Sequence, residues 1–177
     1  FDREGIAVTK SDEEFRKLGV RAAMKELKIS KVTLLRMVLT IKNQIHRRLL
    51  EYPPSSPLKK VLPLLHRHAR LYVLSTNKRD NIEKYLAQYG MIGYFEEIVE
   101  DHSYFGKSSG LSRIQLDHHI DPRDMFYIGD ESRDVDAARK AGCHSVAVLW
   151  GYEGKKPLRA RNPDYIFRHP QELLKLI

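Results

Sequence analysis

The sequence has a single cysteine, Cys143, among its 177 residues, and no apolar run approaches the roughly 18 residues that a transmembrane helix needs. One cysteine excludes a disulfide framework and favours a cytoplasmic setting, and the lack of a spanning run argues against a membrane partner. Internal repeats and low-complexity segments are also absent. With 42% hydrophobic and 31% charged residues, the sequence predicts a globular fold whose core needs no disulfides.

Positive charge is concentrated in the first third of the chain. Residues 1–60 hold 14 Lys and Arg against 7 Asp and Glu, whereas residues 61–177 hold 17 against 16. Three explanations fit this surplus: attraction of an anionic substrate, contact with nucleic-acid phosphates, or a solvated face without a partner. Lys42, Arg47 and Arg48 could form a basic stripe, but no nucleic-acid-binding motif accompanies them, so nucleic acid is not the expected partner.

A change of pattern near residue 54 divides the chain into two predicted domains. Residues 11–50 place apolar side chains at three-to-four spacing without a strand-like run, which indicates a small helical bundle. Pro53 and Pro54 cannot continue a helix. We therefore predict a small helical domain over residues 1–54 and a second domain over residues 55–177.

The second domain alternates apolar strands with helices. The predicted strands span residues 71–74, 95–99, 125–128, 145–149 and 165–167, and the predicted helices span residues 58–68, 79–88, 109–119, 132–141 and 171–176. We expect the run 125–128 to be a buried strand. The alternation predicts an α/β fold, in which a doubly wound parallel sheet is covered by helices on both faces.

Two carboxylates, Asp130 and Asp134, follow the strand predicted at 125–128. They stand four residues apart where that strand gives way to a helix, and open α/β sheets bind ligands at this edge. Two oxygen donors in this place suit a Mg²⁺ ion that keeps most of its waters. The alternative is that Asp130 caps the helix and Asp134 favours its positive end.

Polar residues also follow two other predicted strands. Ser75, Thr76 and Asn77 form a hydroxyl-rich turn that could hold a phosphoryl group or simply cap the next helix. Lys107 precedes a helix, where it is placed to neutralise an anion or is an ordinary surface lysine. Three such groups at the ends of three strands are less expected by chance than any one of them.

In this chain order, the polar residues resemble the motifs of the haloacid dehalogenase (HAD) superfamily. The matches are Ser75, with Thr76 and Asn77 beside it, to the second motif, Lys107 to the third, and Gly129-Asp130 with Asp134 to the fourth. Residues 148–152 are similar to a strand and a Trp/Gly-containing turn of phosphoglycolate-phosphatase-like members. The resemblance implies a Rossmann-like core over residues 55–177 and a mobile helical cap over residues 1–54.

The resemblance further implies Mg²⁺-dependent hydrolysis of a small phosphorylated metabolite through an aspartyl-phosphate. Asp130 would bind the metal, with Asp134 as a direct or neighbouring ligand. Lys107 would balance the charge of the nucleophile and the phosphate. Ser75 would donate a hydrogen bond to a phosphoryl oxygen, and Thr76 and Asn77 would help to bind the substrate.

The first motif of the superfamily is where this chain departs. That motif is an apolar strand ending in Asp-x-Asp-Gly, which supplies the nucleophile, and only Phe1–Gly5 comes close to it. We expect the motif upstream of Phe1, with Asp2 as the alternative nucleophile, so the chain alone is expected to be inactive. The absent strand would lie between the strands that end at Ser75 and Asp130. The alternative function is a HAD-like binding module without catalysis, and the sequence predicts no oligomeric state.

Overall fold

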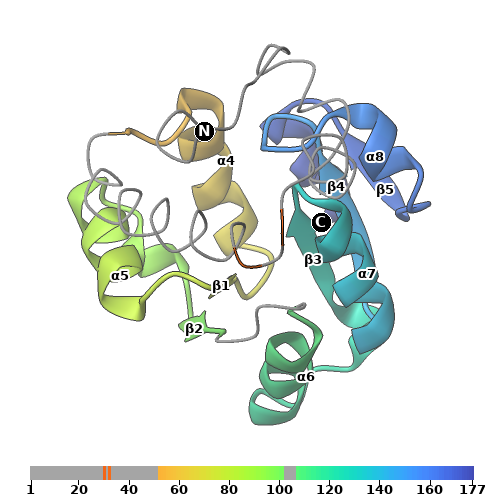
Figure 1. The fold of residues 1–177 in the computed structure, drawn as a ribbon. Helices are drawn as coiled ribbons and strands as arrows, with labels where there is room; N and C mark the ends of the chain where they lie inside the picture. The colour runs from red at the N-terminus through yellow and green to blue at the C-terminus, as the bar shows by residue number, and fades with distance from the viewer. Residues whose placement is uncertain (1–29, 31, 33–51, 102–106) are drawn as a thin grey trace.

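A computed structural model of the chain describes Ser30, Val32 and residues 52–101 and 107–177. The helical domain predicted over residues 1–54 lies almost wholly outside the described residues, so it stays a prediction. Most of the described residues fall within the stretch 55–177, which the sequence predicts to be the second domain (Figure 1).

Five short strands form the centre of the described region, in two parallel groups. The first group pairs β1 (Tyr72–Ser75) with β2 (Glu97–Glu100), and the second has the order β3 (Phe126–Gly129), β4 (His144–Val148), β5 (Tyr165–Phe167). All three pairings are parallel, from Tyr72↔Glu97 in the first group to Val148↔Phe167 in the second. The predicted α/β class with parallel strands is confirmed.

Helices cover both faces of these strands. The helices on one face are α4 (Ser56–His66), α5 (Arg79–Gln88) and the 3₁₀ helix η5 (Pro170–Leu176); those on the other are α6 (Ser108–Asp117), α7 (Ser132–Ala141) and α8 (Lys155–Arg159). Because successive strand residues point to opposite faces, Val146 of β4 packs with α4 and η5 while Ala147 packs with α7 and α8. The short 3₁₀ helices η3 (Ile92–Tyr94) and η4 (Pro122–Asp124) lead into β2 and β3.

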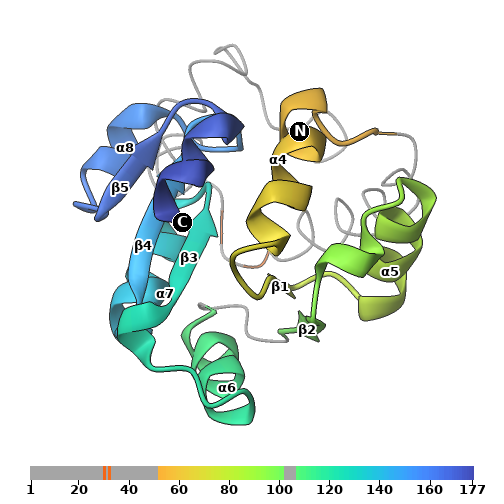
Figure 2. The same ribbon diagram turned by 180° about the vertical axis from the view of Figure 1, so that it is seen from behind.

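Helix α4 connects the two strand groups. Its Val61 and Leu65 pack against Val146 and other residues of the β3–β5 side, while Leu62 packs with α5 and with Ile98 of β2. Both ribbon views place α4 between the two groups (Figures 1 and 2). The apolar stripe of this helix therefore fixes the position of β1 relative to β3.

In the part of the chain that the structure describes, the sheet is interrupted between β1 and β3. Among the described residues, these two strands are hydrogen-bonded to β2 and β4 respectively and to nothing on their other edges. The prediction that residues 125–128 form a buried strand is wrong, because Met125, Phe126 and Tyr127 are half-buried and Ile128 is 41% exposed, whereas Val146 in the middle of β4 is 1% exposed. A strand inside a continuous sheet has covered edges and faces, whereas β3 ends its group. The sequence predicts an absent strand at this place, and its absence stays a prediction.

Two further differences concern the last third of the chain. The residues around Lys155 and Arg159 lie in the short helix α8, where the sequence pattern indicates no element. The closing helix predicted at 171–176 is present but is 3₁₀ in type and starts at Pro170. Helix α7 ends as its sequence suggests, because Gly142 adopts φ 73°, the left-handed conformation that suits glycine after a helix. Among the described helices, none has the length and apolarity to cross a membrane.

Candidate active site

The turn that connects β3 to α7 brings the candidate residues together. It runs from Gly129 through Asp130 to the first turn of α7, where Asp134 lies. Gly129 is required by this geometry, since a Cβ there would stand 2.3 Å from Cβ of Asp134 and 2.5 Å from its Oδ2. The chain can fold the Asp134 carboxylate back over the end of β3 only because residue 129 has no side chain.

Asp134 is the most heavily bonded of these residues. Its Oδ1 lies 3.1 Å from Nζ of Lys107 and accepts a hydrogen bond from the Tyr127 hydroxyl at 3.3 Å. Its Oδ2 accepts from the backbone amides of Asp130 and Glu131, each at 3.2 Å. The Asp134 side chain is 3% exposed. A carboxylate this buried is stable only when its charge is paired and its oxygens are hydrogen-bonded, and both conditions are met.

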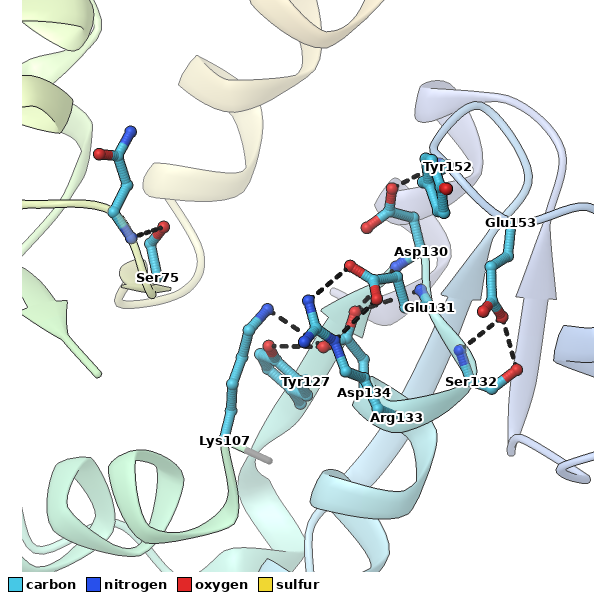
Figure 3. Close-up of polar contacts among 11 residues, drawn as sticks. Ser75, Lys107, Tyr127, Asp130, Glu131, Ser132, Arg133, Asp134, Tyr152 and Glu153 are labelled. Carbon is cyan, nitrogen blue, oxygen red and sulfur yellow. Dashed lines mark hydrogen bonds and ion pairs between the residues drawn. The ribbon is translucent and has the colours of Figure 1, made fainter. Parts of the chain in front are cut away.

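Lys107 reaches this carboxylate from a different element. It is the residue immediately before α6, and its side chain is 18% exposed. The ammonium group also lies 5.6 Å from the centroid of the Tyr127 ring. Burial, followed by the neighbouring charge of Asp134, raises the pKa of Tyr127, so its hydroxyl stays protonated and remains a donor to that carboxylate. Lys107, Tyr127 and Asp134 thus form one compact group (Figure 3).

The Asp130 carboxylate points the other way, toward the loop after β4. Its Oδ2 accepts a hydrogen bond of 2.6 Å from the Tyr152 amide. A Cβ at Gly151 would stand 2.1 Å from Cβ of Asp130, so this acid also rests on a glycine. Among the described residues, the other Asp130 carboxylate oxygen has no hydrogen-bond or ion-pair partner. Asp130 therefore keeps one oxygen available to a ligand.

An ion pair flanks the same turn. Nε of Arg133 lies 2.7 Å from Oε2 of Glu131, and Nη2 of Arg133 donates a hydrogen bond to Oε1 of Glu131 at 2.8 Å. Burial raises the pKa of Glu131 and the Arg133 guanidinium opposes that rise. With Asp130 and Asp134 close by, the turn carries three carboxylates against two cationic side chains, Lys107 and Arg133 (Figure 3).

The hydroxyl-rich turn after β1 is organised locally. The Asn77 amide donates to Oγ of Ser75 at 3.1 Å, and Oδ1 of Asn77 accepts from the Lys78 amide at 2.8 Å and from Asn81 at 3.2 Å. Thr76 is half-buried between them. Figure 3 shows Ser75 set apart from Lys107 and Asp134, across the interruption between β1 and β3. The described contacts do not join this turn to the Asp130 turn.

The structure therefore brings together some of the predicted residues. Lys107, Asp130 and Asp134 meet at the carboxyl end of β3, whereas Ser75, Thr76 and Asn77 stand on the separate β1. Sequence reasoning missed Tyr127, Glu131, Arg133 and the loop residues Tyr152 and Glu153. Glu131 and Arg133 could have been noticed in the sequence, because they are charged residues between Asp130 and Asp134. Tyr152 and Glu153 could not, because their roles depend on contacts with residues 22 and 21 positions away in the sequence.

The oxygen atoms of this turn are the candidate ligands for the Mg²⁺ ion that the motif implies. In residues 52–101 and 107–177, no cluster of three or more His, Cys, Asp or Glu residues is arranged to hold a metal. Mg²⁺ commonly binds through one or two carboxylates and retains its waters, so the available oxygen of Asp130 fits such an ion. Both Asp134 oxygens are engaged, which favours an indirect role for it: fixing the amide of Asp130 and holding Lys107.

Comparison with known proteins agrees with the motifs. Residues 5–148 match the family model of the haloacid dehalogenase-like hydrolases. The chain belongs to this family. A phosphoglycolate phosphatase from Synechococcus elongatus is 36% identical over 107 residues, which cover 60% of this chain and 50% of that protein. One from Vibrio vulnificus is 30% identical over 124 residues, covering 68% of this chain and 54% of the relative. The chain thus spans about half the length of these curated relatives.

Solved structures of the family share the fold. A haloacid dehalogenase-like hydrolase from Streptococcus pneumoniae superposes with a TM-score of 0.77 at 20% identity, covering 99% of this chain and 85% of that one. A structure from Clostridium acetobutylicum described as a predicted phosphatase gives a TM-score of 0.76 at 18% identity, covering 98% and 84%. At these identities the likeness establishes the HAD fold and nothing finer.

Proposed function

We propose that this HAD-family chain is the core of a Mg²⁺-dependent phosphomonoester hydrolase acting on a small phosphorylated metabolite of the phosphoglycolate type. The observation that carries the proposal is the buried contact between Lys107 and Asp134, with the Asp130 carboxylate beside it. These groups put a positive charge and an available carboxylate oxygen at the carboxyl edge of a parallel sheet. The similarity to two phosphoglycolate phosphatases supports the substrate class.

Each side chain has a role in this proposal. Lys107, held in place by Asp134, supplies a positive charge against the anionic oxygens of the transferring phosphoryl group. Asp130 would hold the metal through its available oxygen, and the metal, when bound, neutralises negative charge on the phosphate. Ser75 donates its hydroxyl proton to a phosphoryl oxygen, with the amides of Thr76 and Asn77 beside it. The cap predicted over residues 1–54 selects the substrate.

The nucleophile is the remaining requirement. The 177 residues contain no Asp-x-Asp-Gly, and β1 and β3 each present an edge without a hydrogen-bonded strand among the described residues. We propose that an extended segment ending in this motif lies between them and carries the nucleophilic aspartate, at which an aspartyl-phosphate forms. A strand in that place would bring the Ser75 and Asp130 turns to either side of one phosphate.

We also propose a cytoplasmic location for the protein. The free, buried Cys143 is compatible with it.

The test compares two proteins in a phosphatase assay. One is the 177-residue chain; the other is a chimera in which the part of the Synechococcus elongatus phosphatase that precedes its matched region is placed before Phe1. With 2-phosphoglycolate and Mg²⁺, the chimera is expected to turn over and the chain alone to be slower by about six orders of magnitude, as loss of a nucleophile produces. EDTA or Asp130→Asn should abolish the chimera's activity.

Other results of this phosphatase assay would also decide between the proposed functions. An active 177-residue chain that Asp2→Asn inactivates would assign the nucleophile to Asp2. A folded chimera that releases no phosphate from 2-phosphoglycolate or from p-nitrophenyl phosphate would contradict the hydrolase proposal. In that case the alternative, a HAD-like binding module without catalysis, becomes the better account.

A further inference from the structure

The loop after β4 is joined to the Asp130 turn by four hydrogen bonds. The Tyr152 amide donates to Oδ2 of Asp130 at 2.6 Å, and the Glu153 amide donates to the Asp130 carbonyl oxygen at 3.1 Å. In the opposite direction, the amide and hydroxyl of Ser132 donate to Oε2 of Glu153 at 2.8 and 2.5 Å. Residues 152–153 and residues 130–132 therefore hold one another from both sides (Figure 3).

Glu153 is the unusual member of this arrangement. Only 5% of it is exposed, although it is an acid in a loop that also contacts the Asp130 carboxylate. Burying a carboxylate is costly unless charged or strongly polar donors compensate it. Its compensation comes from the first amide of α7 and the Ser132 hydroxyl, at the positive end of that helix. An acid this buried is thus held by the start of the helix that also contains Asp134.

The same contacts determine where Asp130 points. Asp130 has a single hydrogen bond to its carboxylate among the described residues, and the donor is the amide immediately before Glu153. Without the Glu153 carboxylate, only the backbone amides of Tyr152 and Glu153 join this loop to Asp130, so the Tyr152 amide is held less firmly at Oδ2 of Asp130. The carboxylate could then rotate about χ1, and its second oxygen would lose a fixed direction.

We propose that Glu153 is a positioning residue: it anchors the loop of residues 151–153 to the start of α7 and so aims the Asp130 carboxylate at the bound cation. This inference rests on the proposed function for the cation, but the anchoring itself does not. Glu153 acts through Tyr152 and Ser132 and touches neither the cation nor the substrate. Residues that orient a metal ligand in this way typically change metal affinity by about 10–100-fold when removed.

The experiment follows the Tyr152 amide and Mg²⁺ affinity in the same variants. Amide hydrogen exchange is read residue by residue by NMR, and Mg²⁺ binding by calorimetric titration of the metal alone. In Glu153→Ala, exchange of the Tyr152 amide should accelerate at least about tenfold and Mg²⁺ affinity should fall about tenfold. Glu153→Gln keeps an oxygen that can accept both hydrogen bonds from Ser132. In this variant the exchange rate of the Tyr152 amide should stay within about threefold of its rate in the parent protein.

Two controls separate positioning from a general loss of stability. Glu172→Ala removes a carboxylate that also accepts two backbone amides, those of Arg168 and His169, but at η5. It should lower the melting temperature and leave both the Tyr152 amide and Mg²⁺ affinity unchanged. Ser132→Ala removes one bond to Glu153 and should give a smaller acceleration at Tyr152, which keeps the test decisive if Glu153→Ala does not fold.

The failures are distinguishable. If Glu153→Ala, or Ser132→Ala in its place, leaves Tyr152 exchange within twofold of the parent, the anchoring is wrong whatever the metal does. If exchange accelerates but Mg²⁺ affinity is unchanged, Asp130 is not aimed by this loop and the proposal is also wrong. If the parent protein binds no Mg²⁺, the metal assignment of the proposed function fails, and the Tyr152 amide alone decides whether Glu153 anchors the loop.

Discussion

The turns after β1 and β3 occupy equivalent ends of two parallel strands, yet their polar side chains are held differently. The β1 turn is held by short-range bonds, in which Ser75 and Asn77 accept backbone amides one or two residues away. The carboxylates of the β3 turn are bonded in addition by distant residues: Lys107, which immediately precedes α6, contacts Asp134, and Tyr152 in the loop after β4 contacts Asp130. A locally bonded turn leaves its hydroxyls free to donate to an anion, whereas the distant partners fix two carboxylates in set directions.

The largest effect should come from removing the cation of the β3 turn. Lys107→Met leaves the Asp134 carboxylate buried with only neutral donors, so we expect about 2–3 kcal/mol less stability, somewhat below the usual cost of breaking a buried ion pair because three hydrogen bonds remain. Urea unfolding measures the change. Lys175→Met is the matched control, since its pair with Glu172 is exposed and should contribute little to stability. Equal losses in the two variants would remove the contrast between the turns.

Next come the glycines on which the two acids rest. Gly151→Ala forces its new Cβ against Asp130 and should destabilise the protein by about 1–3 kcal/mol, in the range of overpacked sites. Gly93→Ala is the control, because nothing lies within 4 Å of the Cβ it would add. Thermal unfolding of both variants checks this. If Gly151→Ala were as stable as the parent, Asp130 would not be held against the loop as described.

A smaller loss of stability is expected at the β1 turn. Ser75→Ala removes one hydrogen-bond acceptor for the Asn77 amide, which should cost about 0.5–1 kcal/mol. In the chimera, by contrast, the same change should reduce turnover far more than stability, because the hydroxyl is proposed to contact the phosphate. Parallel measurement of kcat and of urea unfolding separates the two effects, with Ser75→Thr as the variant that keeps the hydroxyl. A turnover that falls only in proportion to the folded fraction would exclude a role in phosphate binding.

The smallest effect concerns a carboxylate that accepts amides at the surface. The amides of Arg168 and His169 and the Lys175 ammonium lower the pKa of Glu172 from its ordinary 4.5 to about 2. A pKa lowered by folding stabilises the protein above the unfolded value and ceases to do so as pH falls through the folded value. The melting temperatures of the parent and Glu172→Gln should therefore differ at pH 6 and converge between pH 4.5 and 2. A difference independent of pH would mean that packing, and not ionisation, is responsible.

The sequence by itself determined much of the core. Alternation of apolar strands with helices specified the parallel α/β class, since such strands are buried on both faces and need helices to cover them. Gly142 marked the end of α7, and Gly129-Asp130 with Asp134 marked the site, because these are local constraints on backbone and spacing. Lys107 was found by its place before a helix and Ser75 by its place after a strand.

Only the tertiary structure decided what each acid does. Asp130 and Asp134 are equivalent in the sequence pattern, but one carboxylate is fully bonded by Lys107, Tyr127 and two amides, while the other keeps an oxygen available. Glu153 gave no signal, because its partner Ser132 lies 21 residues away in the chain. Which groups neutralise a buried charge is decided by packing between elements, and sequence spacing carries no information about contacts made across the sheet.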